Sequence, residues 1–381
     1  MAPPNSASTP PSSSTSTSAI SAAMQPTSSS SPPYHLSFNQ DSSRFSAALQ
    51  TGFRIYTATN PFKSRNFTDA ATGTGAGVRL VAMLFSTNVF CIVKAEVPNK
   101  VFYWNGVSSN TSLPDPSGEL SFRSPVKNVK LRNGVIVVCL LQKVFVYNMA
   151  NFTVLGSFET QVNPKGLCDV SQAKELMVVV SLGLMKGMLN IQNYSGSKKT
   201  RNVIKAHDSE IACLSLTIDG RLVATASSKG TLVRVFNTLD GTLLREVRRG
   251  SDRAEIHCLA FSHDAEWLGV TSSKGTVHVF GLGIDQGKMV VRNNIDAGLE
   301  HSSSLSILKG VLPKYFSSQW SVAQFRLPEG LQHFVAFGPL NTIMIIGMDG
   351  SFYLCEYDQV NGGPMFQREY GNFLHDKFLK H

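Results

Sequence analysis

Short apolar runs separated by polar residues set the pattern of this chain from His35 onward. The runs are short enough for strands and are bounded by Gly, Asn, Asp, Ser or Pro, which favour turns. A sustained period of 3.6 residues is missing except near 302–320, so helices are not indicated elsewhere. The clearest predicted strands are 78–85, 89–94, 101–104, 135–141, 143–147 and 176–180. The chain is therefore predicted to be all-β.

Two segments repeat each other at a fixed spacing, with Ile211 matching Ile256, Lys229 matching Lys274 and Thr231 matching Thr276. A period of roughly 40–50 residues with several strands per unit is typical of β-propeller blades. Weaker copies lie at 133–147 and 341–354. At this spacing, 36–375 holds about seven units. We expect a WD40-like, seven-bladed β-propeller, closed by bringing an early strand beside the last blade.

The N-terminal residues and one internal segment differ from this pattern of short strands. Residues 1–34 are dominated by Ser, Thr, Pro and Ala without a basic residue, which predicts a disordered tail and excludes a transit peptide or secretory signal. The propeller is expected over 35–376, with a long loop, 281–319, inserted in the sixth blade. The longest apolar run, Val135–Leu141, is too short to span a bilayer.

The net charge of +9 is concentrated in one part of the chain. Residues 198–253 hold eleven Lys or Arg against six Asp or Glu, a net charge of +5. An anionic partner is implied, either nucleic acid or an acidic membrane surface. The six cysteines lie singly in apolar segments, which indicates buried thiols in a reducing compartment. With neither paired carboxylates nor metal-ligand spacing, we expect no enzyme, no cofactor and no metal.

Arg248 and Arg249 end an apolar run and precede Gly250. In a strand their side chains would point to opposite sides, so one dipeptide could serve two anion pockets. The matched turns 227–231 and 272–276 offer hydroxyls, backbone N–H groups and a lysine. We expect Arg248 to face the first turn and Arg249 the second. The alternatives are solvated arginines, ordinary WD-type hairpins and a structural His207.

The segment Leu244–Gly250, followed by Asp252-Arg253-Ala254, resembles the Phe/Leu-Arg-Arg-Gly signature of the PROPPINs, the polyphosphoinositide-binding β-propellers of autophagy. The turns 227–231 and 272–276 resemble those of the family's fifth and sixth blades. The resemblance covers about 36–375, and the chain looks like a plant-type member of the family. Val247 stands where the family usually carries Phe or Leu. That side chain is expected to pack rather than to bind lipid.

The resemblance implies two lipid pockets at the rim, for phosphatidylinositol 3-phosphate and phosphatidylinositol 3,5-bisphosphate. The first pocket would comprise His207, Ser227, Lys229, Thr231 and Arg248. The second would comprise Arg249, Arg253, Ser272, Thr276 and His278. Two weak sites on one rigid body gain avidity at a membrane.

The segment 302–320 is amphipathic and is interrupted at Pro313. The corresponding loop of the family enters the membrane, which implies this role for Leu305, Ile307, Leu308, Val311, Leu312 and Phe316. The alternative is that 311–320 packs against the propeller itself.

The resemblance thus implies a non-enzymatic phosphoinositide effector that recruits autophagy machinery for autophagosome formation. It implies a cytoplasmic protein, monomeric in solution and peripheral on preautophagosomal, endosomal or vacuolar membranes. Its expected partners are lipid-transfer and conjugation-machinery proteins. The alternative is a generic WD40-like interaction scaffold whose basic face meets an acidic partner. A nucleic-acid binder is disfavoured because the basic segment lacks interleaved aromatic residues for base stacking.

Overall fold

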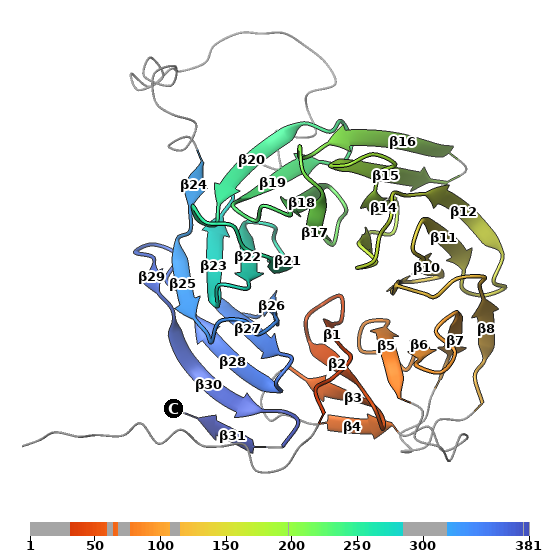
Figure 1. The fold of residues 1–381 in the computed structure, drawn as a ribbon, viewed down its shortest axis with the longest axis horizontal. Coiled ribbons are helices and arrows are strands. Elements are labelled where there is room, and N and C mark those ends of the chain that lie inside the picture. The colour runs from red at the N-terminus through yellow and green to blue at the C-terminus, as the bar shows by residue number, and fades with distance from the viewer. Residues whose placement is uncertain are drawn as a thin grey trace, which may run out of the picture. The chain divides into compact units, whose positions relative to one another are not determined.

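The computed structural model describes residues 31–58, 64–67, 77–106, 115–196, 198–284, 318–375 and 377–380. The regular structure of these residues is β-strand throughout, arranged in seven sheets. All seven sheets belong to one unit, Ser31–His381, and stand around a common centre (Figure 1). The predictions of an all-β chain and of a seven-bladed propeller are confirmed.

The first four blades are four-stranded antiparallel sheets in sequence order. Blade 1 comprises β1 (His35–Phe38), β2 (Arg44–Leu49), β3 (Gly52–Thr57) and β4 (Ser64–Phe67). Blade 2 comprises β5 (Val78–Met83), β6 (Phe90–Lys94), β7 (Lys100–Trp104) and β8 (Gly118–Ser121). Blade 3 comprises β9 (Asn128–Arg132), β10 (Val135–Cys139), β11 (Lys143–Asn148) and β12 (Val154–Glu159). Blade 4 comprises β13 (Cys168–Val170), β14 (Met177–Leu182), β15 (Met188–Ser195) and β16 (Lys198–Lys205).

The last three blades each carry a fifth strand on the outer edge. Blade 5 comprises β17 (Ile211–Leu216), β18 (Leu222–Ser227), β19 (Leu232–Asn237), β20 (Leu243–Arg248) and β24 (Gln319–Trp320). Blade 6 comprises β21 (Ile256–Phe261), β22 (Trp267–Ser272), β23 (Thr276–Gly281), β25 (Ala323–Arg326) and β29 (Gly363–Pro364). Blade 7 comprises β26 (His333–Phe337), β27 (Thr342–Gly347), β28 (Ser351–Glu356), β30 (Phe366–Asn372) and β31 (Lys377–Lys380).

Apolar side chains between neighbouring blades form the core. Seven clusters of buried residues each join two adjacent sheets, so every interface of the ring is filled. The second strand of a blade is buried on both faces and is rich in Val, Ile or Ala, as in β10, β14 and β18. This explains why these strands appear in the sequence as short continuous apolar runs rather than as alternating ones.

The ring closes between blades 7 and 1 through side-chain packing. Tyr56 donates a hydrogen bond from its hydroxyl to the Phe373 carbonyl at 2.9 Å, and the ring centroids of Phe45 and Phe373 are 5.1 Å apart. β1 lies beside β26, as expected of an early strand, but it pairs only with β2. The outer position of blade 7 is taken by β31, so none of the described strands is exchanged between the two blades.

Candidate functional site

The two Ser-Ser-Lys-Gly-Thr turns have the same geometry. Gly230 and Gly275 both adopt φ +65, and their N–H groups bond to the carbonyls of Ser227 and Ser272 at 2.9 and 3.1 Å. A Cβ at Gly230 would lie 1.8 Å from the Ala254 carbonyl oxygen, and one at Gly275 would lie 2.4 Å from that of Leu327. Glycine is required at both turns because the connector to the next blade lies directly against them.

Arg248 ends β20 at the outer side of blade 5. Its backbone pairs with Leu232 of β19 on one side and with Trp320 of β24 on the other. Its side chain is half-buried and acts electrostatically on Glu246. Val247, the preceding residue, is fully buried in the cluster between blades 5 and 6. The alternation expected of a strand therefore separates a buried apolar side chain from a guanidinium that reaches the surface.

Arg249 lies just beyond β20 and is only 7% exposed. Its N–H donates to the Thr231 carbonyl at 2.9 Å, and its Nε donates to the Gly230 carbonyl at 2.9 Å. Its Nη2 donates to the Asp252 carbonyl. Arg249 thus ties the first turn to the connector 250–255, while its charge also acts on His278 of blade 6.

The connector 250–255 contacts both turns. The Ala254 N–H donates to the Lys229 carbonyl at 3.2 Å, and the Arg253 Nε donates to the Ser228 carbonyl at 3.3 Å. At the other turn, the Ser273 N–H donates to the Glu255 carbonyl at 2.9 Å. Arg253, which the resemblance assigns to the second pocket, is therefore placed against the first turn. The two turns and the arginines between them form one connected structure.

Two buried histidines flank this structure. His207 lies between β16 and β17, with Nε2 3.0 Å from the Thr225 hydroxyl, and burial, followed by the charge of Arg234, lowers its pKa to about 4. His278 lies in β23, with Nδ1 3.1 Å from the Ser321 hydroxyl. Burial, followed by the charge of Arg249, lowers the pKa of His278 to about 4. Both imidazoles are therefore neutral at pH 7 and can contribute hydrogen bonds rather than charge.

The hydroxyl and amine groups of the two turns are the remaining polar side chains of the candidate site. Lys229 and Lys274 are exposed, whereas Thr231 and Thr276 are partly buried at the starts of the following strands. Ser227 and Ser272 end β18 and β22 and are 6% and 2% exposed. Among the described residues, the buried Ser272 hydroxyl oxygen has no hydrogen-bond partner. Hydroxyls, amines and guanidinium groups gathered in this way suit a phosphate-bearing ligand.

A cavity of about 560 Å³ opens beside the turns. Ser228, Arg253 and Lys274 line one side of it, and the connector from blade 3 to blade 4 lines the other. Lys165 of that connector lies 2.7 Å from Glu255, which ties it to the connector from blade 5 to blade 6. Arg253 and Lys274 therefore border a hollow rather than a flat surface.

Several residues that lie beside Arg248 belong to no motif that could be recognised in the sequence. Glu246 accepts a hydrogen bond from the Arg234 Nε at 2.8 Å and one from the Ser318 hydroxyl at 2.8 Å. Burial would raise the pKa of Glu246, but these hydrogen bonds and the charges of Arg234 and Arg248 hold it below its usual value. Trp320, beside Arg248, is 47% exposed. Only the order of strands around β20 brings these groups to the site.

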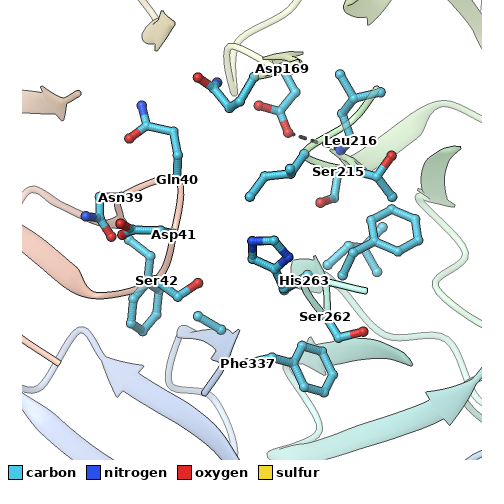
Figure 2. Close-up of a pocket in the computed structure, with 18 of the residues that line it drawn as sticks. Asn39, Gln40, Asp41, Ser42, Asp169, Ser215, Leu216, Ser262, His263 and Phe337 are labelled. Carbon is cyan, nitrogen blue, oxygen red and sulfur yellow. Dashed lines mark hydrogen bonds between the residues drawn. The ribbon is translucent and has the colours of Figure 1, made fainter. Parts of the chain in front are cut away.

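A second hollow, drawn in Figure 2, lies among turns and strands near the centre of the ring and has a volume of about 230 Å³. Asp169 accepts hydrogen bonds from the Leu216 and Val170 N–H groups, both at 3.1 Å, and lies 3.5 Å from the Lys130 ammonium group. Gln40 donates to the carbonyls of Met83 and Leu131, both at 2.9 Å. These polar groups join neighbouring blades, which is a structural role.

The membrane-insertion residues Leu305, Ile307, Leu308, Val311, Leu312 and Phe316 lie outside the described residues. Within the described ranges, no group of three or more His, Cys, Asp or Glu is arranged to hold a metal. The same ranges contain no helix that is long and apolar enough to cross a membrane.

The fold and the site define a class of protein, a seven-bladed β-propeller with two equivalent basic turns joined by an arginine pair. A family model described as PROPPIN matches residues 34–292. The chain belongs to the PROPPIN family. It is 38% identical to autophagy-related protein 18e of Arabidopsis thaliana, with 89% of this chain and 87% of the relative covered. It is 30% identical to autophagy-related protein 18 of Dictyostelium discoideum, with 87% and 90% covered.

Solved structures of similar propellers show the same fold. Hsv2 of Kluyveromyces lactis is 23% identical, with a TM-score of 0.71, and the similarity covers 90% of this chain and 99% of that one. KlAtg21, in its complex with the coiled coil of AgAtg16, is 25% identical with a TM-score of 0.70. There the similarity covers 90% of this chain and 100% of that one.

Proposed function

We propose that this chain is a non-enzymatic phosphoinositide effector of autophagy. One observation carries the proposal, namely two turns of equal geometry with Arg248, Arg249 and the connector 250–255 between them. The ligands would be phosphatidylinositol 3-phosphate and phosphatidylinositol 3,5-bisphosphate. Guanidinium groups and hydroxyls together suit a phosphorylated ring because they supply both charge and directed hydrogen bonds.

The two pockets keep the composition that the family resemblance implies. His207, Ser227, Lys229, Thr231 and Arg248 form the first, and Arg249, Arg253, Ser272, Thr276 and His278 the second. Arg249 and Arg253, which are assigned to the second pocket, donate to carbonyls of the first turn, so the pockets would share a wall. Binding at one pocket brings the other to the same membrane at high effective concentration, which supplies avidity.

The remaining assignments follow the same proposal. Residues 1–34 are a disordered tail, and the propeller begins at residue 35 and, with β31, extends past the expected end at residue 376. The loop between β23 and β24 enters the membrane through its apolar residues. The protein is peripheral on preautophagosomal, endosomal or vacuolar membranes. It recruits lipid-transfer and conjugation-machinery proteins, and KlAtg21, a similar propeller, forms a complex with a coiled coil of AgAtg16.

Liposome flotation tests this proposal. Vesicles would contain phosphatidylinositol 3-phosphate, phosphatidylinositol 3,5-bisphosphate or unphosphorylated phosphatidylinositol. We expect the native chain to float with the first two, and Arg248→Ala with Arg249→Ala to stay unbound. Arg248→Ala with Lys229→Ala provides a second variant, because both side chains reach the surface and their loss leaves the Arg249 contacts in place. Arg221→Ala, an exposed arginine of the β17–β18 turn, serves as the matched control.

Equal flotation of native chain and variants would overturn the proposal. A chain that ignores phosphoinositides but captures an acidic protein would instead favour the interaction scaffold. For the loop, Leu305→Asp with Leu308→Asp should reduce flotation while leaving the binding of a soluble inositol 1,3-bisphosphate headgroup unchanged. Loss of headgroup binding in that variant would contradict an insertion role.

A further inference from the structure

The outermost strand of blade 4, β16, is longer than the outermost strands of blades 1 to 3, which likewise have no described strand beyond them. It pairs with β15 in unbroken register over its full length, from Lys198 opposite Ser195 to Lys205 opposite Met188. The corresponding pairings of blades 3, 5 and 7 are each interrupted by a register shift. Blades 5, 6 and 7 also have their outer edges covered by β24, β29 and β31, whereas no described strand lies beyond β16 (Figure 1). β16 is thus a long, regular and open edge.

The backbone of this edge offers alternate N–H and C=O groups to an added strand. The Ala206 N–H donates to the Gly187 carbonyl at 2.9 Å, which makes this a hydrogen-bonded pair of the ladder. Such pairs alternate along an antiparallel ladder, so the backbone groups of Lys199, Arg201, Val203 and Lys205 point away from β15. Among the described backbone hydrogen bonds outside the strand ladders, none involves these four residues.

The side chains of these residues form a basic stripe on one face of β16. The Lys199 ammonium group donates to the Leu155 carbonyl of blade 3 and lies 5.5 Å from the Tyr194 ring centroid. The Arg201 Nε donates to the Asn190 side-chain oxygen at 2.9 Å, and Val203, the other residue of this face, is exposed. The Lys205 ammonium group lies 3.3 Å from Asp208, and both side chains are largely exposed. The strand itself contains no acidic residue. A cross-strand neighbour on this face would therefore be favoured if it were acidic.

The other face of β16 turns toward blade 5 and is partly apolar. Ile204 packs in the cluster that includes Phe236 of β19. A groove of about 420 Å³ runs beside it and is lined by Asn202, Ile204, Phe236, Gly241 and Leu243, with Lys205 and Asp240 among its polar residues. Leu243 is 47% exposed. Apolar side chains of an added strand that point to this face near Ile204 could therefore contact the exposed Leu243.

We propose that the edge of β16 binds an extended acidic segment of a partner protein as an additional strand. Acidic side chains at alternate positions would face Lys199, Arg201 and Lys205, and apolar side chains between them would face the groove. The lysines disfavour a basic strand, including β16 of a second copy, because like charges opposite each other destabilise a ladder. Charge therefore selects which strand binds, and the main-chain hydrogen bonds supply the part of the affinity that does not depend on sequence.

Fluorescence anisotropy with labelled ten-residue peptides tests the proposal. We expect an alternating Glu/Leu peptide to bind, and a shuffled peptide of equal composition and an alternating Lys/Leu peptide to bind at least about tenfold more weakly. Methylating the backbone nitrogens at every second residue should abolish binding for the set that faces β16, whereas the other set should tolerate it. This readout does not depend on the folding of any protein variant.

Protein variants test the same edge. Val203→Pro removes one outward N–H, which an edge strand tolerates, and Lys199→Glu with Arg201→Glu reverses the stripe. Each should weaken binding by at least about tenfold. The matched control is Lys186→Glu with Lys198→Glu, which makes the same charge change in the β14–β15 hairpin and on the other face of β16. Circular dichroism confirms folding, and the charge variant carries the test if Val203→Pro does not fold.

Three results would overturn the proposal. The first is equal binding of the alternating and shuffled peptides, or of both methylated sets. The second is a native chain that binds no peptide but binds phosphatidylserine vesicles without phosphoinositide, with weaker vesicle binding in the Lys199→Glu with Arg201→Glu variant. That result would assign the stripe to a membrane. The third is a dimer in sedimentation that Val203→Pro dissociates, which would assign the edge to a second copy.

Discussion

Replacing Arg249 with alanine should destabilise the propeller more than replacing Arg248 does. Arg249 donates from Nε to the Gly230 carbonyl at 2.9 Å and from Nη2 to the Asp252 carbonyl. A hydrogen bond from a charged donor contributes about 1.5–3 kcal/mol. Gly230 is buried, so its carbonyl would lose its partner, whereas Asp252 is exposed and its carbonyl can bind water instead.

The net cost of Arg249→Ala follows from these contacts and from the burial of the charge. Burial lowers the pKa of Arg249, which means that desolvating the guanidinium already offsets part of the gain. We therefore expect a loss of about 2 kcal/mol in the free energy of unfolding. Over the roughly 350 residues of the unit Ser31–His381, the unfolding entropy converts this loss to a Tm about 3 °C lower.

Differential scanning calorimetry and hydrogen exchange would measure the effect. Arg249→Ala should lower the Tm and speed exchange in 228–231 and 250–255, which its side chain joins. Arg248→Ala, which leaves those contacts intact, should lower the Tm less than Arg249→Ala, and Arg249→Lys should have a Tm between those of the native chain and Arg249→Ala. A native Tm and native exchange in Arg249→Ala, or an equal loss in Arg248→Ala, would refute the reasoning.

Three further predictions concern the same region. Gly230→Ala should lower the free energy of unfolding by several kcal/mol, because Gly230 has a positive φ and its Cβ would meet the Ala254 carbonyl. Gly250→Ala, with nothing within 4 Å of its Cβ, should lower it by less than about 0.5 kcal/mol, and equal losses in denaturant unfolding would contradict this prediction. Val247→Ala should cost about 2 kcal/mol and Val247→Leu under about 1.5 kcal/mol, as checked by urea melts, and a native stability for Val247→Ala would count against its packing role. His207 and His278 have folded pKa values of about 4, below the 6.5 of the unfolded chain, so the stability linked to them is complete above about pH 6.5 and is lost as the pH falls toward 4. This loss is about 3 kcal/mol per histidine, and replacing either with Gln should flatten the pH profile of the urea midpoint.

The sequence predicted the propeller because a blade is a local unit. Each predicted strand needs only its own apolar run, and the repeat from Ile211 to Ile256 needs only two neighbouring copies. The fifth strands were not predictable in the same way. β24 and β29 are two residues long and join sheets to which the preceding strand does not belong, so no local pattern marks them. Closure without strand exchange likewise depends on β31, a strand at the far end of the chain.

The residues of the candidate site were predictable as types, but their contacts were not. The Ser-Ser-Lys-Gly-Thr turns are local and were found in place, with both glycines at the same positive φ. The partners of Arg249, however, are the carbonyls of Gly230 and Asp252, and every residue carries a carbonyl. Ser321, the partner of His278, lies 43 residues further along the chain. Backbone acceptors and distant hydroxyls leave no mark in the local sequence.

Strand alternation accounts for the direction of the Arg248 side chain but not for that of Arg249. Side chains alternate only as far as the strand continues, and β20 ends at Arg248. Arg249 therefore takes its direction from the connector 250–255, which bends back so that Arg253 meets the Ser228 carbonyl of the first turn. One arginine reaches the surface while its neighbour holds the turn in shape. A loss of lipid binding in Arg249→Ala would thus combine a missing ligand contact with a loosened first turn, whereas Arg248→Ala leaves the hydrogen bonds of Arg249 to the first turn in place.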